Sequence, residues 1–354
     1  MDFSFQGLVH SHSQQMDAAF RSLVDTLIQN SKLNITLLRI SNVTEDSFHV
    51  TLEARLTKTG PATAKITPMT VDLCGPSGHF GNVRLPAITT RAFGTDVVVT
   101  SQLVSIVDKD ALKAFIQAII KDDVELALRN GQTTITALGI GPRDVVYQKE
   151  ILLHGMRGPI VGIQAASLIT ANPSLGTPPT TANPGVARSH TATSVSSTLG
   201  GENAVSVVLR VSNPSPLEIS FGICSFDIQD DQGRLVAELK GRLDIRRNQF
   251  EVTFQGNVNK AVAAKLATDM GAAARAGGSK YGRKDGRSPK ARLVGKRCVG
   301  AGWCDETVKS INVPLQDVSI LFETLGIEDG AGEPQPHGKS GGGFTGWGDR
   351  FMLR

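Results

Sequence analysis

The stretch Leu38-Arg39-Ile40-Ser41-Asn42 returns, with one change, as Leu209-Arg210-Val211-Ser212-Asn213. The segments that come after the two copies are also alike. β-type runs come after the first copy and lead into a helix-like segment, Lys109–Lys121. β-type runs come after the second copy and lead into another helix-like segment, Asn259–Met270. This order predicts one domain used twice, a tandem duplication rather than a solenoid, which needs about three or more repeats.

The hydrophobic residues around both copies alternate with polar ones, which is the period of a half-buried strand. In the first half the alternating residues are Leu33, Ile35, Leu37 and then Phe48, Val50, Leu52, Ala54, Leu56; in the second they are Val205, Val207, Leu209, Val211. A parallel α/β fold would need a helix between most strands. We therefore predict a mainly β protein, built of tandem antiparallel β-sandwiches that each carry one inserted helix.

Short sequence motifs predict the start of the first helix, and they also predict a hairpin and a last strand region. Asp108 is a good N-cap for the first helix. Asn130-Gly131 is typical of a two-residue hairpin and would separate strands 124–128 and 133–138. The last strand region is expected over Glu306–Phe322.

Composition shifts divide the chain into five parts. An amphipathic helix is expected within 1–31, and a Ser-, Thr-, Pro- and Gly-rich linker over 157–202. The two sandwiches fill 32–156 and 203–325, the second with a basic loop over 273–297. A glycine-rich tail, 326–354, has little to bury and is predicted to be disordered.

The charge of the 354-residue chain is mild overall, at +4, but unevenly placed. Nine Lys/Arg and one acid lie between Arg275 and Arg297, so the rest of the chain is slightly acidic. No run of 18 apolar residues predicts a membrane span, and the first residues do not resemble a secretory signal. Four cysteines are too few for a disulfide scaffold. Cys74 and Cys224 are expected to be buried thiols, and a local disulfide between Cys298 and Cys304 is one option in an oxidising compartment.

No motif for catalysis is evident. The chain has no Gly-x-Ser-x-Gly elbow, no Walker loop and no His-Glu-x-x-His. His10 and His12 are weak metal candidates at a terminus, and the adjacent carboxylates Asp122-Asp123 and Asp230-Asp231 are typical of solvated turns. We expect no enzyme activity, no metal site and no cofactor.

Three groups of residues are candidate sites. The first helix has an apolar stripe that either closes a core or forms the movable wall of a lipid groove: Leu112, Phe115, Ile116 and Ile119. The basic loop is either solvated or a site for anionic surfaces, with Lys280, Arg283, Lys284, Arg287 and Lys290. Tyr281 is its only aromatic, so nucleic acid is not the expected partner. Asn42, in a turn, is the better of two glycosylation sequons, but it matters only if the chain enters the secretory pathway.

The first half resembles a fungal domain-of-unknown-function family related to late-embryogenesis-abundant type 2 (water-stress, hypersensitive-response) proteins. The residues that carry the resemblance are Ser47-Phe48, Thr59–Ala64, Gly81–Pro86, Leu138-Gly139 and Tyr147-Gln148-Lys149. The resemblance implies a fibronectin-like sandwich with one helix, a vacuolar or endomembrane setting, a link to the end of autophagy, and a groove that holds lipid. That family has a transmembrane helix, which is absent from this chain, so the resemblance leaves the location undecided.

Together these observations predict a non-enzymatic protein that binds lipid, a membrane surface or a membrane-associated protein partner. The first alternative is a nucleic-acid or ribonucleoprotein-associated module that acts through the basic loop. The second is a biosynthetic-pathway enzyme whose site has no recognisable motif.

Overall fold

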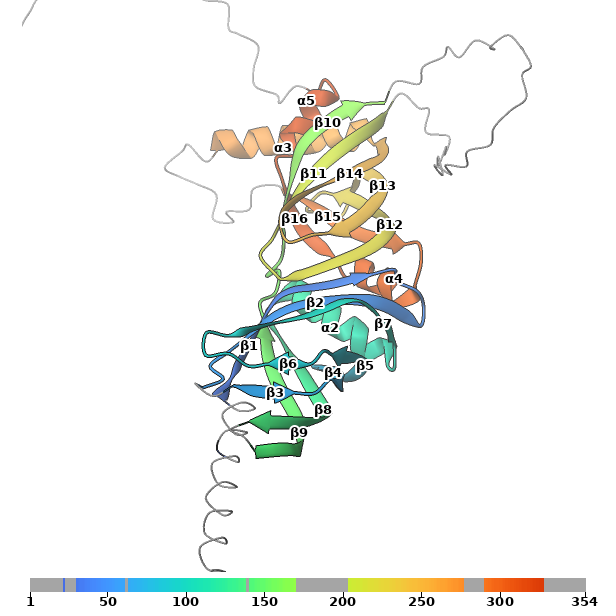
Figure 1. The fold of residues 1–354 in the computed structure, drawn as a ribbon. Coiled ribbons are helices and arrows are strands. Elements are labelled where there is room, and N and C mark those ends of the chain that lie inside the picture. The colour runs from blue at the N-terminus through green and yellow to red at the C-terminus, as the bar shows by residue number, and fades with distance from the viewer. Residues whose placement is uncertain are drawn as a thin grey trace, which may run out of the picture.

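The computed structural model describes residues 30–60, 63–137, 140–169, 203–276 and 290–327, together with residue 22. The expected N-terminal helix, most of the linker, most of the basic loop and nearly all of the tail lie outside these residues. The described chain is mainly β and forms two halves stacked end to end (Figure 1).

The first half is a two-layered β structure. One layer contains three strands, in the order β1-β2-β7, and the other contains β5-β4-β8-β3-β6, with β9 also paired to β8. Side chains that alternate along β1 and β2 fill the space between the layers; Phe48, Val50 and Leu52 are only 1–2% exposed. The bounds are β1 (Lys32–Ser41), β2 (Ser47–Thr57), β3 (Ala64–Ile66), β4 (Met69–Gly75), β5 (Gly78–Leu85), β6 (Ile88–Thr89), β7 (Thr95–Ser105), β8 (Val124–Ala137) and β9 (Ile140–Leu153).

The helix of the first half, α2 (Lys109–Lys121), begins where Asp108 accepts hydrogen bonds from the backbone N–H groups of Asp110 and Ala111. This confirms the predicted N-cap. The apolar stripe of α2 faces the core, and Phe115 stacks on Phe80 of β5 with ring centroids 5.1 Å apart. The helix therefore closes one end of the first half.

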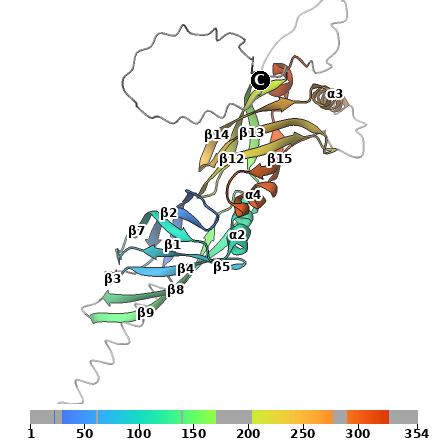
Figure 2. The ribbon, with the colours of Figure 1, turned by 90° about the vertical axis from the view of Figure 1, so that its right-hand side faces the viewer.

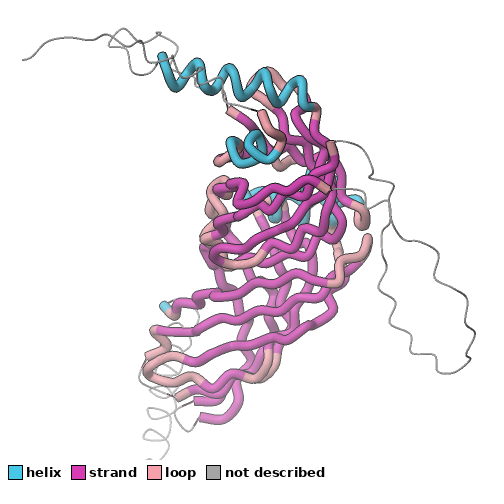
Figure 3. The backbone as a smooth tube through the Cα atoms, turned by 90° about the horizontal axis from the view of Figure 1, so that it is seen from above, coloured by secondary structure: helices cyan, strands magenta, loops and turns pink. Residues whose placement is uncertain are grey.

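The second half is a closed barrel of seven strands. Following the pairs from β12 through β13, β14, β11, β10, β16 and β15 leads back to β12. Figure 3 shows this half from above. The bounds are β10 (Ile160–Leu168), β11 (Ala204–Asn213), β12 (Leu217–Gln229), β13 (Leu235–Ile245), β14 (Asn248–Val258), β15 (Ala291–Cys298) and β16 (Asn312–Gln316). Helices α3 (Lys260–Ala276) and α5 (Ser319–Thr324) lie at its far end, and α4 (Gly302–Lys309) lies next to α2 at the junction (Figure 2).

The halves are joined by a parallel strand pair, in which Leu38 and Ile40 of β1 lie opposite Leu217 and Ile219 of β12. This pair makes the β1-β2-β7 layer continuous with the barrel. Glu218 fixes the junction from outside, because its carboxylate binds Arg39 at 2.7 Å and Arg247 at 3.1 Å.

The structure corrects the prediction of two matching sandwiches. The first half is a layered structure and the second is barrel-like, so the mainly β class holds but the fibronectin-like tandem does not. The two copies of the repeated stretch lie in strands with different neighbours: β1 pairs with the next strand, β2, whereas β11 pairs with β14 and β10. The sequence repeat marks a strand in each half but not an equivalent place in the sheet.

Three local predictions also need correction. Residues 160–168 of the expected linker form β10, which has only two buried side chains, Val161 and Ile163, and so gave a weak signal. Asn130-Gly131 does not make a hairpin; β8 runs through it with a register shift, and Asn130 adopts a positive φ of 57°. The expected last strand region contains β16, but it begins inside α4, whose buried residues Trp303, Cys304, Thr307 and Val308 have a helical spacing.

Candidate functional site

The first candidate site is an apolar chamber between the two layers of the first half. Its lining comes from strands of both layers: Leu33, Leu52, Leu56, Ile66, Leu85, Ile88, Val97, Ile135 and Tyr147. The cavity holds about 10 Å³, close to the minimum for one water. Because the walls are apolar, a water here would have few partners, and such cavities stay dry.

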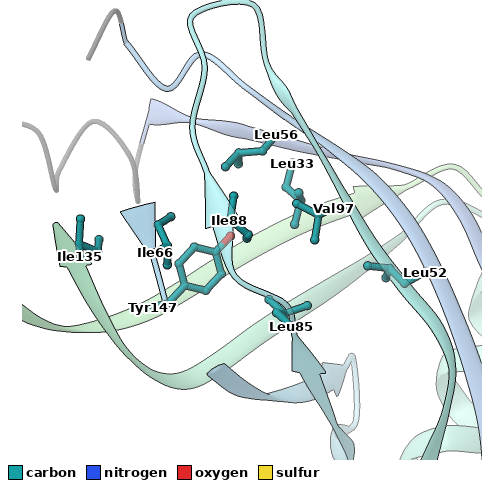
Figure 4. Close-up of a pocket in the computed structure, with 9 residues that line it drawn as sticks. All are labelled: Leu33, Leu52, Leu56, Ile66, Leu85, Ile88, Val97, Ile135 and Tyr147. Carbon is teal, nitrogen blue, oxygen red and sulfur yellow. The ribbon is translucent and has the colours of Figure 1, made fainter. Parts of the chain in front are cut away.

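The only polar group among these side chains is the hydroxyl of Tyr147 in β9. Tyr147 is 5% exposed, and Figure 4 shows its oxygen pointing towards Ile88. Burial raises the pKa of Tyr147 to about 12, so the hydroxyl is neutral at physiological pH. A hydroxyl that a tyrosine brings into a core usually takes a hydrogen-bond partner. It is the one polar group that the side chains of this lining offer to a ligand.

Sequence reasoning placed Tyr147 in a strand and in the family resemblance, but not in a site. One signal could have drawn attention to it: the chain has only two tyrosines, and this one sits in an apolar strand. A tyrosine at an inward position brings a hydroxyl into a core, where it usually needs a partner.

The predicted lipid groove along α2 lies elsewhere and is closed. Leu112, Phe115, Ile116 and Ile119 are all 0–1% exposed. A Cβ added at Gly75 would lie 2.9 Å from the Cβ of Phe115, so the helix packs tightly on β4. The four residues lie together on one face of α2, as predicted, and that face is part of the closed core.

A second cleft, of about 610 Å³, lies over the β4–β5 turn and is polar. Asp72 is its centre: its carboxylate accepts hydrogen bonds from Asn82 at 2.6 Å and from Asn130 at 2.7 Å, and lies 3.9 Å from Nε2 of His79. Cys74 lines the same cleft and is half-buried, not fully buried as expected. Burial raises the pKa of the Cys74 thiol, which opposes its use as a nucleophile.

A third cleft, of about 260 Å³, lies at the junction of the halves. It is formed by residues 41–43 at the end of β1, residues 220–222 in β12 and residues 299–301 before α4, with Cys304 at its wall. Asn42 is exposed on its rim with a positive φ of 48°. The turn position predicted for Asn42 is therefore confirmed, whereas its glycosylation stays a prediction.

The basic-loop candidates Lys280, Arg283, Lys284 and Arg287 lie outside the described residues. Lys290 is described and is exposed immediately before β15. Among the residues that the structure describes, no helix is long and apolar enough to cross a membrane. The same residues contain no group of three or more His, Cys, Asp or Glu side chains arranged to hold a metal ion.

Comparison with known proteins gives one family match. Residues 78–180 match the family described as "Protein of unknown function (DUF3712)". This agrees with the expected resemblance to a domain-of-unknown-function family over part of the chain. No curated protein matches the sequence.

Similarity to solved structures is low. The solution structure of a protein described as a candidate late embryogenesis abundant (LEA) protein is 16% identical, with a TM-score of 0.23, over 41% of this chain and 88% of that one. The exo-chitosanase CsxA of Amycolatopsis orientalis is 10% identical, with a TM-score of 0.18, over 73% of this chain and 25% of that one. A cross-linked adhesin of Mobiluncus mulieris is 11% identical, with a TM-score of 0.17, over 64% of this chain and 77% of that one.

Proposed function

We propose that this chain is a non-enzymatic binding protein for a lipid-like molecule, taken up between the two layers of its first half. The observation that carries the proposal is the 5% exposed Tyr147, whose hydroxyl is the one polar side-chain group in the lining of an apolar chamber. A fatty acid or a related amphipathic molecule fits this chemistry, because its chain would contact the aliphatic walls and its polar group would pair with the hydroxyl.

The size of the chamber sets a condition on binding. A cavity of about 10 Å³ does not admit an acyl chain, so the layers must separate or the lining side chains must move. The weakest part of the wall is β6, which has only two residues and, among the described strands, pairs with β3 alone. Ile88 of β6 lies where the hydroxyl of Tyr147 points (Figure 4). We therefore place the opening at β6.

A membrane-associated role draws support from a second observation. The outer side of β7, at the edge of its layer, and the turns next to it expose several large apolar side chains: Phe93, Val98, Leu103 and Val107. Phe93 is 93% exposed, which is costly in water and favourable at a membrane interface. The endomembrane setting rests on the family resemblance, and the nucleic-acid alternative rests on the basic loop.

The test is titration of the delipidated full-length chain with a fluorescent fatty acid. Tyr147→Phe removes one oxygen and keeps the ring. We expect affinity to fall about fivefold, corresponding to one hydrogen bond of about 1 kcal/mol, while stability is unchanged or rises. Ile88→Phe fills the chamber and should weaken binding further.

Leu293→Phe, the same type of enlargement in the barrel, is the matched control and should leave binding unchanged. If wild-type protein binds no fatty acid, or if both chamber variants bind as tightly as wild type, lipid binding in this chamber is excluded.

A further inference from the structure

Three of the four cysteines, distant in sequence, meet at one place at the base of the barrel. Cys224 lies in β12, Cys298 ends β15, and Cys304 is in the first turn of α4. All three are free thiols and are 0–4% exposed. Cys298 lies opposite Cys224 in the pair of β12 and β15, and its N–H donates to Asp305, the residue after Cys304. It is therefore the central member of the cluster.

The β-ladder holds Cys224 and Cys298 at a separation suited to a disulfide. The two residues are directly opposite in the antiparallel pair of β12 and β15. The N–H of Val299 donates to the carbonyl of Ile223 at 2.8 Å, so Cys224 and Cys298 form a non-hydrogen-bonded pair. The Cα atoms of such a pair are about 4.5 Å apart, within the range of about 4.4–6.8 Å that disulfides use.

The amide of Cys298 is held from the other side. Its N–H donates to the carboxylate of Asp305 at 2.8 Å. This agrees with the non-hydrogen-bonded pairing, in which the N–H of Cys298 is not bonded to β12. Asp305 is itself bound to Lys309 at 2.6 Å along α4. These contacts fix the end of β15 against α4 and keep Cys298 facing Cys224.

The local hydrogen bonds distinguish Cys298 from its neighbours. Hydrogen bonds from the thiols of Cys224 and Cys304 lower the pKa of Cys298, and the same contacts raise the pKa of each donor. The carbonyl of Phe221 opposes this, since it accepts from Sγ of Cys298 at 3.2 Å and so favours the protonated form. Cys298 is also the more exposed member of the opposed pair, at 4% against 0% for Cys224, so a small oxidant reaches its sulfur first.

The junction cleft gives a small oxidant a way in. Cys304 forms part of the wall of this cleft of about 260 Å³, and Cys298 is next to it in the cluster. The wall also contains Gly300, whose φ of 147° few other residues adopt. A peroxide, which is little larger than water, can enter such a space, whereas a protein oxidant cannot.

We infer that the cluster is a peroxide-sensitive site in which Cys298 is oxidised first and Cys224 then closes a disulfide. The Cys298 thiolate attacks hydrogen peroxide, which breaks the O–O bond, forms the sulfenic acid and releases hydroxide. The Cys224 sulfur attacks the sulfenic sulfur, forms the S–S bond and displaces the sulfenic oxygen, which takes the Cys224 proton and leaves as water. The proton that Cys298 lost at the start neutralises the hydroxide. In sum, two thiols and one peroxide give one disulfide and two waters. The sulfur of Cys304 stays a thiol.

The test uses the full chain, treated with hydrogen peroxide under native conditions and mapped by mass spectrometry without reduction. A peptide cross-linked through Cys224 and Cys298 is expected, with the loss of two titratable thiols and their return on addition of dithiothreitol. Cys298→Ser and Cys224→Ser should each abolish the cross-link, and Cys298→Ser should also prevent the loss of thiols at low peroxide. Cys304→Ser should keep the cross-link, and Cys74→Ser, away from the cluster, is the matched control.

The wild-type measurement needs no variant, so misfolding of a serine variant leaves the test decisive. A disulfide between Cys298 and Cys304, oxidation confined to Cys74, or over-oxidation of Cys298 without a disulfide would each overturn the assigned pair.

Discussion

The carboxylate of Glu45, in the turn between β1 and β2, accepts a hydrogen bond from the backbone N–H of Gly302, the first residue of α4, at 2.7 Å. Residue 301, which precedes α4, has no side-chain cap, so the first half supplies the cap for a helix of the second. Trp303 reinforces this contact by donating from Nε1 to the carbonyl of Thr44 at 3.2 Å. Lys109 of α2 binds the other oxygen of Glu45 at 2.9 Å. A carboxylate at a helix N-terminus also favours the helix dipole.

Replacing Glu45 with Gln should therefore lower stability in a pH-dependent way. The N–H of Gly302, and then Lys109, hold the pKa of Glu45 below its usual 4.5. A group with a depressed folded-state pKa stabilises the fold above its unfolded pKa and loses this contribution as the pH falls through the folded value. The urea midpoint of Glu45→Gln should lie below that of wild type at pH 7, and the two should converge once the pH has fallen below the depressed pKa of Glu45. Glu125→Gln, at an exposed position of β8, is the control. A difference that persisted after the Glu45 carboxyl has been protonated would assign the effect to packing instead of charge.

Truncating Phe115 tests whether α2 closes a core. Phe115 is 1% exposed and stacked on Phe80, so Phe115→Ala should cost about 3–5 kcal/mol in the free energy of unfolding. Phe93→Ala, at a site that is 93% exposed, should change the same quantity by less than about 0.5 kcal/mol. A small loss for Phe115→Ala, together with weaker binding of a fatty acid, would support the groove predicted along the helix.

Gly256 tests the closure of the barrel. It lies in β14 opposite Leu239 of β13, and an added Cβ would come within 1.7 Å of the carbonyl oxygen of Glu238. Gly256→Ala should therefore force β13 and β14 apart and destabilise the barrel by at least about 2 kcal/mol. Gly141→Ala, where the added Cβ meets nothing within 4 Å, is the control. Hydrogen exchange in β13 should rise in the first variant alone; unchanged protection there would mean that the strand pair tolerates the methyl group.

The sequence predicted those strands and helices whose hydrophobic pattern lies within one short segment. Alternation along 33–37 and 48–56 predicted β1 and β2, and Asp108 with the apolar stripe after it predicted α2 with its bounds. These elements are determined by the side chains of a single segment and the period of the backbone.

The features that the sequence did not predict depend on partners far away in the chain. The barrel closes because β12 pairs with β13 on one side and with β15 on the other, and no local pattern distinguishes this from a sandwich. Cys224 and Cys298 sit in separate strands, so their meeting could not be read from spacing. The chamber around Tyr147 likewise depends on how two layers face each other.

The place of β10 gives a prediction about how the halves hold together. This strand precedes residues 170–202 in the chain, yet it is one of the strands of the barrel wall, between β11 and β16. It pairs with β11 from Ile160 opposite Ser212 to Leu168 opposite Val205, and Thr324 of α5 donates to the carbonyl of Ala166 at 3.3 Å. A cut in the chain after β10 would therefore leave one strand of the barrel attached to the first half.

We expect that cutting the chain at a protease site inserted after residue 183 will not separate the halves. The two fragments should co-elute in gel filtration under native conditions and part only in denaturant, because separation would remove β10 from the barrel and expose its neighbours. Placing a charge in β10, as in Ile163→Asp, should weaken this association, since Ile163 is 1% exposed. Ile160→Asp, at a 58% exposed position of the same strand, is the matched control and should co-elute like wild type. Two fragments that eluted separately after cleavage of the wild-type sequence would mean that the barrel is stable without β10 and that the halves are independent domains.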